Sequence, residues 1–270
     1  MRRLQLFELE DQPWVPALVR DGATDLLDLL FARIGMYRPL APAFAAFMQV
    51  TGQRRWLDVC SGGGGGALAM REALVALAQG PDAITLTDRY PNAAAQARVV
   101  ARADPSVRYL PEPVDALAVP PHPPALRTMF GALHHFPPVV VQRVLQAAVA
   151  ERVPIAFVDV AASPALRAVP VALAPVAALP NLVMLVLIAL LLTPLARPFR
   201  WSRLVWTYLV PAIPILFAWD GTVSALRAYT PEELLALARS IPGGDRYEWD
   251  ARRAGQALML TGRVSQGRAR

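Results

Sequence analysis

The sequence predicts an α/β fold in which a mostly parallel, seven-stranded sheet is interrupted by an apolar insert. Three observations lead to this prediction. Short apolar runs alternate with helix-like stretches up to about residue 160, a run of glycines follows the first of them, and residues 160–219 contain no Asp or Glu. Short strands that alternate with helices are typical of βαβ units and therefore of a parallel sheet.

The part before residue 160 is expected to consist of strands joined by helices, after an N-terminal helical segment over residues 14–50. The expected strands are Arg55–Val59, Ala83–Thr87, Val107–Leu110, Arg127–Phe130 and Ile155–Val158. The expected helices run from the glycines to about Ala78, from the N-cap Asn92 to Ala101, and over Val139–Val149.

The pattern of a soluble domain returns beyond Asp220. Thr230-Pro231-Glu232-Glu233 predicts a helix start, with an N-cap, a proline at the first helical position and acidic residues in the first turn. Arg246–Trp249 and Ala257–Thr261 are the two closing strands. We therefore expect a helical cap over residues 1–50, a sheet domain over 51–163 and 219–270, and an apolar insert over 164–218.

Composition excludes several classes of protein. The net charge is +6, but no Arg-rich arm or aromatic–basic repeat is present, so no nucleic-acid partner is expected. Cys60 is the only cysteine among 270 residues, which excludes an intrachain disulfide and a CxxC metal site, and no metal is expected. No apolar run follows Met1-Arg2-Arg3, so no secretory signal is expected.

A glycine-rich turn after the first strand predicts a nucleotide-type cofactor site. Asp58 ends the strand, and Cys60 and Ser61 lead into the glycines 62–66. Glycines let a ligand lie against the main chain at the carboxyl edge of the sheet. Asp88 follows the next strand, 22 residues after Gly66, where its carboxylate can accept hydrogen bonds from both hydroxyls of a ribose.

Two cofactor classes fit this turn. Gly62, Gly64 and Ala67 match the dinucleotide pattern GxGxxG/A, which would suit a nicotinamide-dependent oxidoreductase. Asp58 with Gly62 and Gly64 also resembles motif I of the class I S-adenosylmethionine-dependent methyltransferases, although Cys60 departs from the motif at its first glycine.

Two further segments extend the resemblance to class I methyltransferases. Val114-Asp115-Ala116 is similar to the family's segment after the third strand, where an acidic side chain meets the adenine amino group. Residues 128–136 resemble the motif after the fourth strand, which lines the methyl-transfer site in small-molecule enzymes of the family. The resemblance implies a Rossmann-like fold, S-adenosyl-L-methionine as cofactor, and a cofactor site formed by Asp58, Cys60, Ser61, Gly62, Gly64, Asp88, Arg89, Asp115 and Ala116.

The candidate catalytic residues are His134, His135 and Asp159. Methyl transfer from a sulfonium requires alignment and removal of a proton from the acceptor, and imidazole titrates near neutral pH. Asp159 follows the fifth strand at the same edge of the sheet and could orient a histidine or the acceptor, or form a helix cap or an Arg pair. The two histidines with Asp58 and Asp115 favour a methyltransferase over a dehydrogenase. A non-catalytic, membrane-bound cofactor-binding protein is a further alternative.

A looser similarity covers nearly the whole chain. Uncharacterised, membrane-associated bacterial methyltransferase-like proteins have segments that resemble Leu57–Gly64, Arg197–Phe199, Trp219–Gly221 and Leu226–Tyr229. This similarity implies no substrate. Asp220, Arg227 and Tyr229 either close over an acceptor or, in the interpretation that we favour, anchor the end of the insert through hydrogen bonds.

The apolar composition of the insert predicts contact with a membrane. Ala168–Leu195 has 28 uncharged residues, with Asn181–Leu192 as its best helix after three prolines, and Leu204–Ala218 has 15, with Pro211 and Pro214 interrupting it. A transmembrane hairpin, a shallow interfacial hairpin and a buried core hairpin all remain possible.

A full hairpin would translocate three Arg, because both flanks belong to the same sheet. Shallow insertion avoids this conflict, and the lack of acidic residues suits anionic headgroups. We expect membrane contact through residues 168–218, an apolar or lipid-like small-molecule acceptor, and a location at the cytoplasmic face of the cell membrane, with a soluble cytoplasmic protein as the alternative. The oligomeric state is left open.

Overall fold

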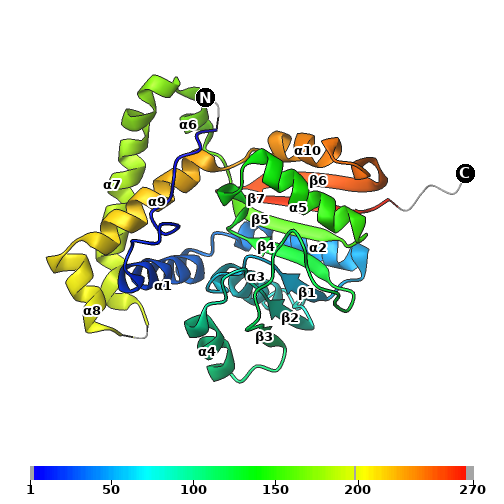
Figure 1. Cartoon of the computed structure of the whole chain (residues 1–270), viewed down its shortest axis with the longest axis horizontal. Coiled ribbons are helices and arrows are strands. Elements are labelled where there is room, and N and C mark those ends of the chain that lie inside the picture. Colours follow the sequence, from blue (N-terminus) through cyan, green and yellow to red (C-terminus); the bar gives the residue numbers. More distant parts are fainter. Residues whose placement is uncertain (1–2, 198, 266–270) are drawn as a thin grey trace, which may run out of the picture. The chain divides into compact units, whose positions relative to one another are not determined.

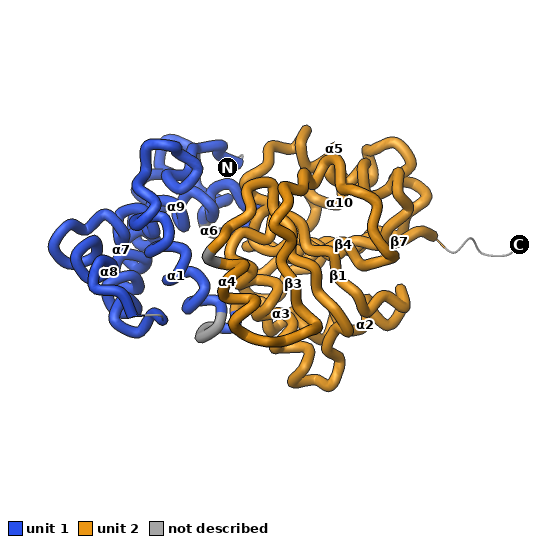
Figure 2. The backbone as a smooth tube through the Cα atoms, turned by 60° about the horizontal axis from the view of Figure 1, so that its bottom comes forward, with its two compact units in different colours: residues 1–35, 162–228 blue, residues 36–161, 229–270 orange. Residues whose placement is uncertain are grey.

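The structure, a computed structural model, describes residues 3–197 and 199–265; Pro198, in the segment 197–199 matched above, lies outside them. The chain divides into two compact units (Figure 2). Unit 1 comprises residues 1–35 and 162–228, and unit 2 comprises 36–161 and 229–270. This division differs from the expected one, because the first 35 residues group with the apolar insert and residues 36–50 group with the sheet.

Unit 2 contains, among its described residues, one seven-stranded sheet in the order β3-β2-β1-β4-β5-β7-β6. The first five strands are parallel, and β7 lies antiparallel between β5 and β6. The expected mostly parallel, Rossmann-like sheet is thereby confirmed. Its strands are β1 (Arg55–Asp58), β2 (Ala83–Leu86), β3 (Val107–Tyr109), β4 (Leu126–Phe130), β5 (Ile155–Val160), β6 (Tyr247–Ala254) and β7 (Ala257–Val264).

Helices cover both faces of this sheet (Figure 1). Phe44 of α2 packs on Trp56 of β1, with the ring centroids 5.0 Å apart. On the other face, α5 buries Val141, Val144 and Leu145, at helical spacing, in a cluster shared with α10 and strands β4–β7. The helical elements of unit 2 are η1 (Arg38–Leu40), α2 (Ala41–Thr51), α3 (Gly65–Val75), α4 (Ala93–Ala101), η2 (Leu133–His135), α5 (Pro138–Ala150), α10 (Pro231–Ser240) and η6 (Gly244–Arg246).

Both predicted helix caps are present. The side chain of Asn92 accepts a hydrogen bond from the Ala95 amide at 2.9 Å, so α4 begins where its N-cap predicts. Thr230 and Glu233 form a capping box at the start of α10, in which each side chain accepts a hydrogen bond from the other residue's backbone amide. Local sequence therefore defines the start of both helices.

Unit 1 is a helical unit built from segments far apart in the sequence. Val19 and Leu26 of α1 are buried in one cluster with Ile213 and Leu216 of α9. Its elements are α1 (Ala17–Ile34), α6 (Pro164–Ala168), η3 (Val171–Leu173), α7 (Ala174–Leu192), η4 (Thr193–Leu195), α8 (Trp201–Leu204), η5 (Val205–Leu209, a π-helical turn) and α9 (Ala212–Arg227).

Two expectations about prolines in the insert are wrong. Helix α7 begins at Ala174 and continues through Pro180, whereas the sequence predicts a helix only from Asn181. Packing accompanies the added turns, since their Ala174 and Ala178 are buried, and the Asn181 side chain that follows them donates to the Thr222 hydroxyl of α9 at 3.0 Å. Pro214 lies in the first turn of α9, where a missing amide costs little, so the break falls at Pro211, with a 76° bend.

Buried polar groups hold unit 1 together. Arg203 pairs with Asp25 of α1 at 2.5 Å, and Arg227 pairs with Glu8 at 3.1 Å. Asp220 accepts hydrogen bonds from the backbone amides of Leu9 and Glu10 at 2.6 and 2.9 Å. These contacts agree with the interpretation that Asp220 and Arg227 anchor the insert, although both residues belong to α9 itself.

Candidate functional site

The loop after β1 is fixed to the sheet by a buried carboxyl group. Asp58 is 1% exposed and accepts hydrogen bonds from the hydroxyls of Ser61 at 2.6 Å and Thr128 of β4 at 2.7 Å. Burial raises the pKa of Asp58 to about 7, although the two hydroxyls oppose the shift. The structure thus gives this predicted cofactor residue a positioning contact, in which it ties the loop to the neighbouring strand.

The backbone of this loop adopts left-handed conformations. Gly62 and Gly64 have φ values of +51° and +80°, and the non-glycine Cys60 has +56°. A Cβ at Gly64 would lie 2.9 Å from Leu86, whereas a Cβ at Gly62 would meet nothing within 4 Å. The space beside the Gly62 main chain is therefore unoccupied, as a ligand that lies against the main chain requires.

Cys60 is unsuited to nucleophilic chemistry. Burial and the nearby carboxylates, above all Asp88, raise the pKa of its thiol to about 12. The thiolate is the reactive form of cysteine, and it is scarce at neutral pH when the pKa is this high. Cys60 therefore contributes backbone geometry at the position where the family's motif has its first glycine.

Asp88 lies beside the glycine loop, just beyond the end of β2. Its Oδ2 accepts a hydrogen bond from the Gly62 amide at 2.8 Å, and its Oδ1 accepts one from the Tyr90 amide at 2.9 Å. Each carboxylate oxygen has two lone pairs, so both oxygens keep an acceptor site after these bonds. The half-buried carboxylate is thus oriented by the main chain and can still accept hydrogen bonds from a diol.

The segment after β3 adds a second carboxylate next to Asp88. The Val114 amide donates to the Asp88 carbonyl at 2.8 Å, which brings Asp115 and the buried Ala116 to this edge. The Asp115 carboxylate lies 3.6 Å from the guanidinium of Arg89 and accepts a hydrogen bond from the Leu117 amide at 2.9 Å. The predicted cofactor residues from three loops therefore lie together.

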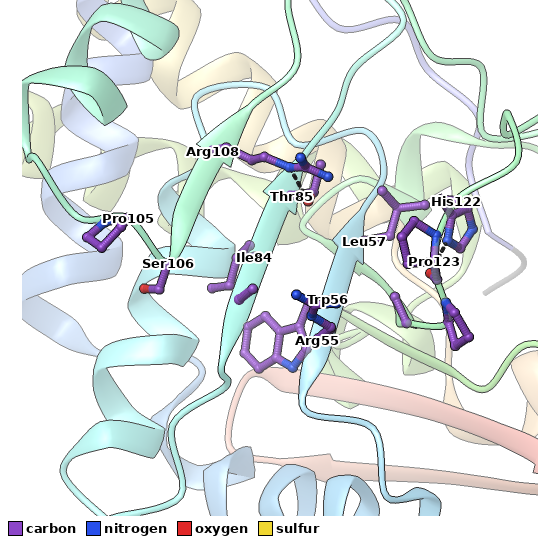
Figure 3. A pocket seen from close by; sticks show the side chains of 13 residues that line it. Arg55, Trp56, Leu57, Ile84, Thr85, Pro105, Ser106, Arg108, His122 and Pro123 are labelled. Atoms are coloured by element: carbon purple, nitrogen blue, oxygen red, sulfur yellow. Dashed lines mark hydrogen bonds between the residues drawn. The ribbon is translucent and has the colours of Figure 1, made fainter.

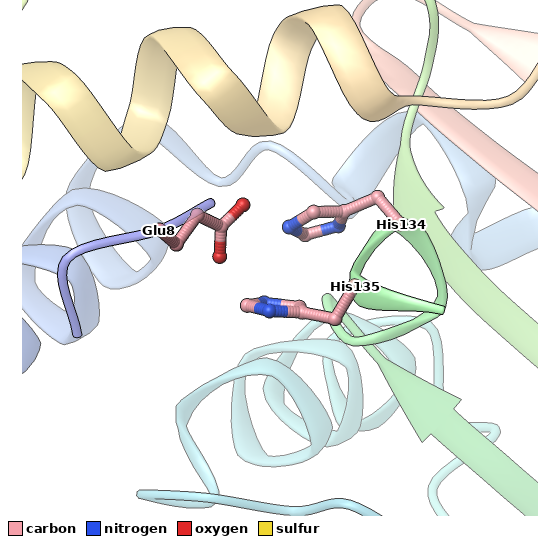
Figure 4. Close-up of side chains that lie close together, drawn as sticks. All are labelled: Glu8, His134 and His135. Atoms are coloured by element: carbon pink, nitrogen blue, oxygen red, sulfur yellow. The ribbon is translucent and has the colours of Figure 1, made fainter. Parts of the chain in front are cut away.

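The two predicted histidines lie side by side on η2, after β4 (Figure 4). Their ring centroids are 4.4 Å apart. His134 is buried, and its Nδ1 lies 2.7 Å from Oδ1 of Asp159 in β5. The His134 backbone amide also donates to Oδ2 of Asp159, at 2.6 Å. The structure therefore pairs His134, rather than His135, with the predicted Asp159.

Hydrogen bonding to Asp159 determines which nitrogen of His134 accepts a proton. The carboxylate of Asp159 receives the His134 amide, the His134 ring and, at 2.7 Å, the Val160 amide. A carboxylate only accepts, so Nδ1 carries the proton in this contact, and in the neutral ring Nε2 is the nitrogen without a proton. Asp159 is part of β5 itself and is 2% exposed, and these bonds replace the helix cap or Arg pair considered from the sequence.

Two tyrosines near the loop carry no recognisable sequence signal. Tyr109, the last residue of β3, donates its hydroxyl to the Gly62 carbonyl at 2.9 Å. Tyr37 is 2% exposed, and its ring is tilted against that of Phe130 with a centroid distance of 6.0 Å. A Cβ at Gly66 would lie 3.3 Å from the Tyr37 ring. Burial, together with the charges of Asp159 and Asp58, raises the pKa of Tyr37 well above its usual value. The sequence places Tyr37 only in a helical cap, because its proximity to the site is long-range.

A cavity of about 300 Å³ lies elsewhere on the sheet of unit 2 (Figure 3). The crossover from β3 to β4, residues 110–125, has six prolines and no helix among these described residues, so part of the sheet is left open. Leu57, Thr85 and Arg108 are paired neighbours there, and Arg108 Nε donates to the Thr85 hydroxyl at 2.9 Å. None of the predicted site residues lines this cavity.

Comparison with known proteins yields structural likeness alone. No family model matches the sequence, and no curated protein matches it. Solved structures do match. An O-methyltransferase family protein from Burkholderia thailandensis has 12% identity and a TM-score of 0.50, with 89% of this chain and 59% of that one covered.

Two further solved structures match over most of this chain. Human N-acetylserotonin methyltransferase in complex with SAM has 12% identity and a TM-score of 0.51, with coverage of 93% and 61%. PigF with SAH has 14% identity and a TM-score of 0.50, with coverage of 94% and 63%. The chain thus spans about six-tenths of the length of these structures. At such low identity the likeness shows the fold alone, which this chain shares with these three structures.

Proposed function

We propose that the chain is an S-adenosylmethionine-dependent methyltransferase that acts on a small-molecule acceptor. The observation that carries the proposal is the orientation of Asp88 by two backbone amides, directly beside an open, left-handed glycine loop. This loop follows β1, next to the point where the strand order of the sheet reverses, and ligands of open α/β sheets bind at such points.

The residues present fit S-adenosylmethionine. Asp88 would accept hydrogen bonds from the two ribose hydroxyls, and Asp115 would accept one from the adenine amino group. Gly62 leaves the main chain open for close approach, since nothing occupies the space that a side chain there would take. When bound, the cofactor supplies an electrophilic methyl group on a sulfonium.

His134 is proposed as the general base. The Nδ1–H bond to Asp159 leaves Nε2 as the atom that takes a proton from the acceptor. Asp159 also stabilises the imidazolium formed by that transfer, because both its oxygens receive hydrogen bonds from His134. Proton removal of this kind contributes about 10²–10⁴-fold to rate.

The rival activity, hydride transfer with a nicotinamide cofactor, has less support. The methyltransferase proposal uses Asp115 and the His134–Asp159 pair, for which the dinucleotide pattern has no role. The three solved structures described above are titled as a methyltransferase or as a complex with SAH. An apolar or lipid-like acceptor stays a prediction.

Cofactor titration tests the proposal directly. We expect calorimetry of the purified chain to show binding of S-adenosylhomocysteine and none of NADH. If the chain binds NADH and does not bind S-adenosylhomocysteine, the methyltransferase proposal is wrong and an oxidoreductase is the better interpretation. The chain could also bind S-adenosylhomocysteine and yet form no methylated product when it is added to extracts with labelled cofactor. That result would indicate a non-catalytic cofactor-binding protein.

Base catalysis is tested by comparing the neighbouring histidines. Once an acceptor is found, His134→Gln and Asp159→Asn should lower kcat by about 10²–10⁴-fold and leave the Kd for S-adenosylhomocysteine unchanged. His135→Gln is the matched control, since no Asp159 bond is lost. A larger loss in His135→Gln than in His134→Gln would reassign the base.

A further inference from the structure

One side of helix α7 is apolar and exposed. Val171–Leu195, which includes α7, is long and apolar enough to cross a membrane, yet only 17% of its most apolar stretch is buried. Along α7, large apolar side chains recur at helical spacing and are exposed. We call this set the α7 stripe: Val176, Leu179, Val183, Met184, Leu187 and Leu191.

The opposite side of α7 is buried against α9. Leu185 lies against Gly221, where a Cβ would approach its Cδ1 to 2.8 Å, and Asn181 donates to Thr222. Ala178 and Ala189 are buried as well. Because α7 is already packed on this side, the α7 stripe is not needed for the core of unit 1. Soluble monomers rarely expose continuous apolar surface of this kind, so the stripe indicates a binding surface.

Charge and aromatic residues identify an anionic lipid bilayer as the partner. Residues 160–219 contain four Arg and no acidic residue. Arg203 is buried against Asp25, and of the four Arg it is Arg197 that is exposed. Trp201, the first residue of α8, is 75% exposed, and α8 contacts η4, which directly follows α7. Tyr208 donates its hydroxyl to the Leu190 carbonyl near the C-terminal end of α7. Arg197 is exposed and lies between η4 and α8. Trp and Tyr gather at bilayer interfaces, and Arg is attracted to anionic headgroups.

The packing of unit 1 decides between crossing the bilayer and lying on it. Helix α9 packs against α1, and α1 carries Asp21, Asp25 and Asp28. If α7 crossed the hydrocarbon core, its partners would bring these carboxylates and the Asp220 of α9 into lipid, which is costly. An α7 that lies in the plane of the interface inserts its exposed stripe alone.

We propose that unit 1 docks on the surface of an anionic bilayer, with α7 parallel to the membrane plane and the α7 stripe inserted at the boundary of headgroups and acyl chains. Trp201 and Arg197 attach the C-terminal end of the helix. This attachment does not depend on the proposed methyl transfer, because unit 1 contains none of the cofactor or catalytic residues.

Flotation with vesicles tests the attachment. The full chain is mixed with phosphatidylcholine vesicles that contain about a quarter phosphatidylglycerol, and we expect it to float with them. Leu187→Gln with Leu191→Gln should weaken binding by about tenfold per substitution, since each removes inserted apolar surface. The matched control is Val100→Gln with Val139→Gln, two exposed apolar residues of unit 2, which should bind as the parent does.

Two further measurements make the result decisive. Arg197→Gln, or high salt, should weaken binding to the anionic vesicles and have little effect with phosphatidylcholine alone. Light scattering measures the molar mass of the parent and of the α7-stripe variant. It tests whether a second copy of this chain, rather than a bilayer, covers the α7 stripe. The proposal is overturned if the parent does not float, if the control variant loses as much binding as the α7-stripe variant, or if the parent is a dimer that the α7-stripe substitutions dissociate.

Discussion

The two units distribute polar and apolar side chains in opposite ways. Unit 2 has an apolar core around its sheet and places two buried carboxyl groups, Asp58 and Asp159, where the parallel strands end. Unit 1 exposes the α7 stripe and buries its charges as ion pairs, with Asp25 on Arg203 and Glu8 on Arg227. Buried charge therefore has two different uses in one chain.

The partners of the buried carboxylates show the difference. In unit 2 the partners of Asp58 and Asp159 are hydroxyls, backbone amides and an imidazole. These neutral donors orient the two carboxyl groups without pairing them with a fixed positive charge. In unit 1, Asp25 and Glu8 pair with guanidinium groups, while Asp220 accepts hydrogen bonds from two backbone amides. These contacts join segments distant in sequence, because Arg203 and Asp25 are 178 residues apart. The comparison teaches that burial of an ionisable group indicates a site only when its partners leave a reactive atom available.

The largest expected effect comes from breaking an ion pair of unit 1. Asp25→Ala leaves Arg203 buried and without its carboxylate, so the free energy of unfolding should fall by about 3–5 kcal/mol. Urea denaturation measures the loss. The control is Asp82→Ala, which breaks the exposed pair with Arg54 and should cost at most about 1 kcal/mol. Equal losses of unfolding free energy in the two variants would contradict the prediction that the buried pair stabilises unit 1.

The pH dependence of stability tests the buried carboxyl of unit 2. Because the pKa of Asp58 is raised to about 7, the folded protein keeps a proton that the unfolded chain releases near pH 4. Stability from this group is full below pH 4 and is lost as the pH rises towards 7, by up to about 1.4 kcal/mol per pH unit. Asp58→Asn should flatten this profile in urea titrations between pH 4 and 7.

The matched variant for that titration lies in unit 1. Burial raises the pKa of Asp220 to about 6, while the Leu9 and Glu10 amides oppose the shift. Asp220→Asn should therefore flatten the profile over a lower range, ending near pH 6, and leave the slope between pH 6 and 7 in place. A profile that Asp58→Asn does not change would contradict the assignment of the upper range to Asp58.

Loss of the carboxylate beside the glycine loop should weaken cofactor binding. Asp88→Ala removes charge-assisted hydrogen bonds worth about 1.5–3 kcal/mol, which is about 10–150-fold in the Kd for S-adenosylhomocysteine by calorimetry. The exposed Asp82→Ala again serves as the control and should bind normally. An unchanged Kd in Asp88→Ala would separate this carboxylate from the cofactor site.

The smallest effect is expected at Cys60. Its left-handed backbone costs about 1 kcal/mol, which glycine would relieve, but glycine also loses packing and adds freedom to the unfolded chain. Cys60→Gly should therefore change the free energy of unfolding by less than about 1 kcal/mol. Cys60→Val should cost more, because a β-branched residue is rare at positive φ. Equal stability of the two variants would contradict a strained loop.

Much of the fold and of the candidate site is predictable from the sequence because its signals are local. The glycines 62–66, the N-caps at Asn92 and Thr230, and the acidic residues that end strands lie within a few residues of the elements they define. Parallel strands bring their carboxyl ends to one edge, so the sequence alone is enough to group Asp58, Asp88 and Asp115. The proximity of the histidines to Asp159 follows from the same edge, but the choice between His134 and His135 does not.

The sequence by itself determined the strand–helix alternation, the cofactor-type loop and the apolar character of the insert, since each is a property of neighbouring residues. Only the tertiary structure decided that the first 35 residues join the insert, that α7 continues through Pro180, and that Tyr37 and Tyr109 lie close to the glycines after β1. These outcomes depend on contacts between distant segments, whose packing energy outweighs local preference. The same contacts decide which side of α7 is buried, and therefore which side is exposed.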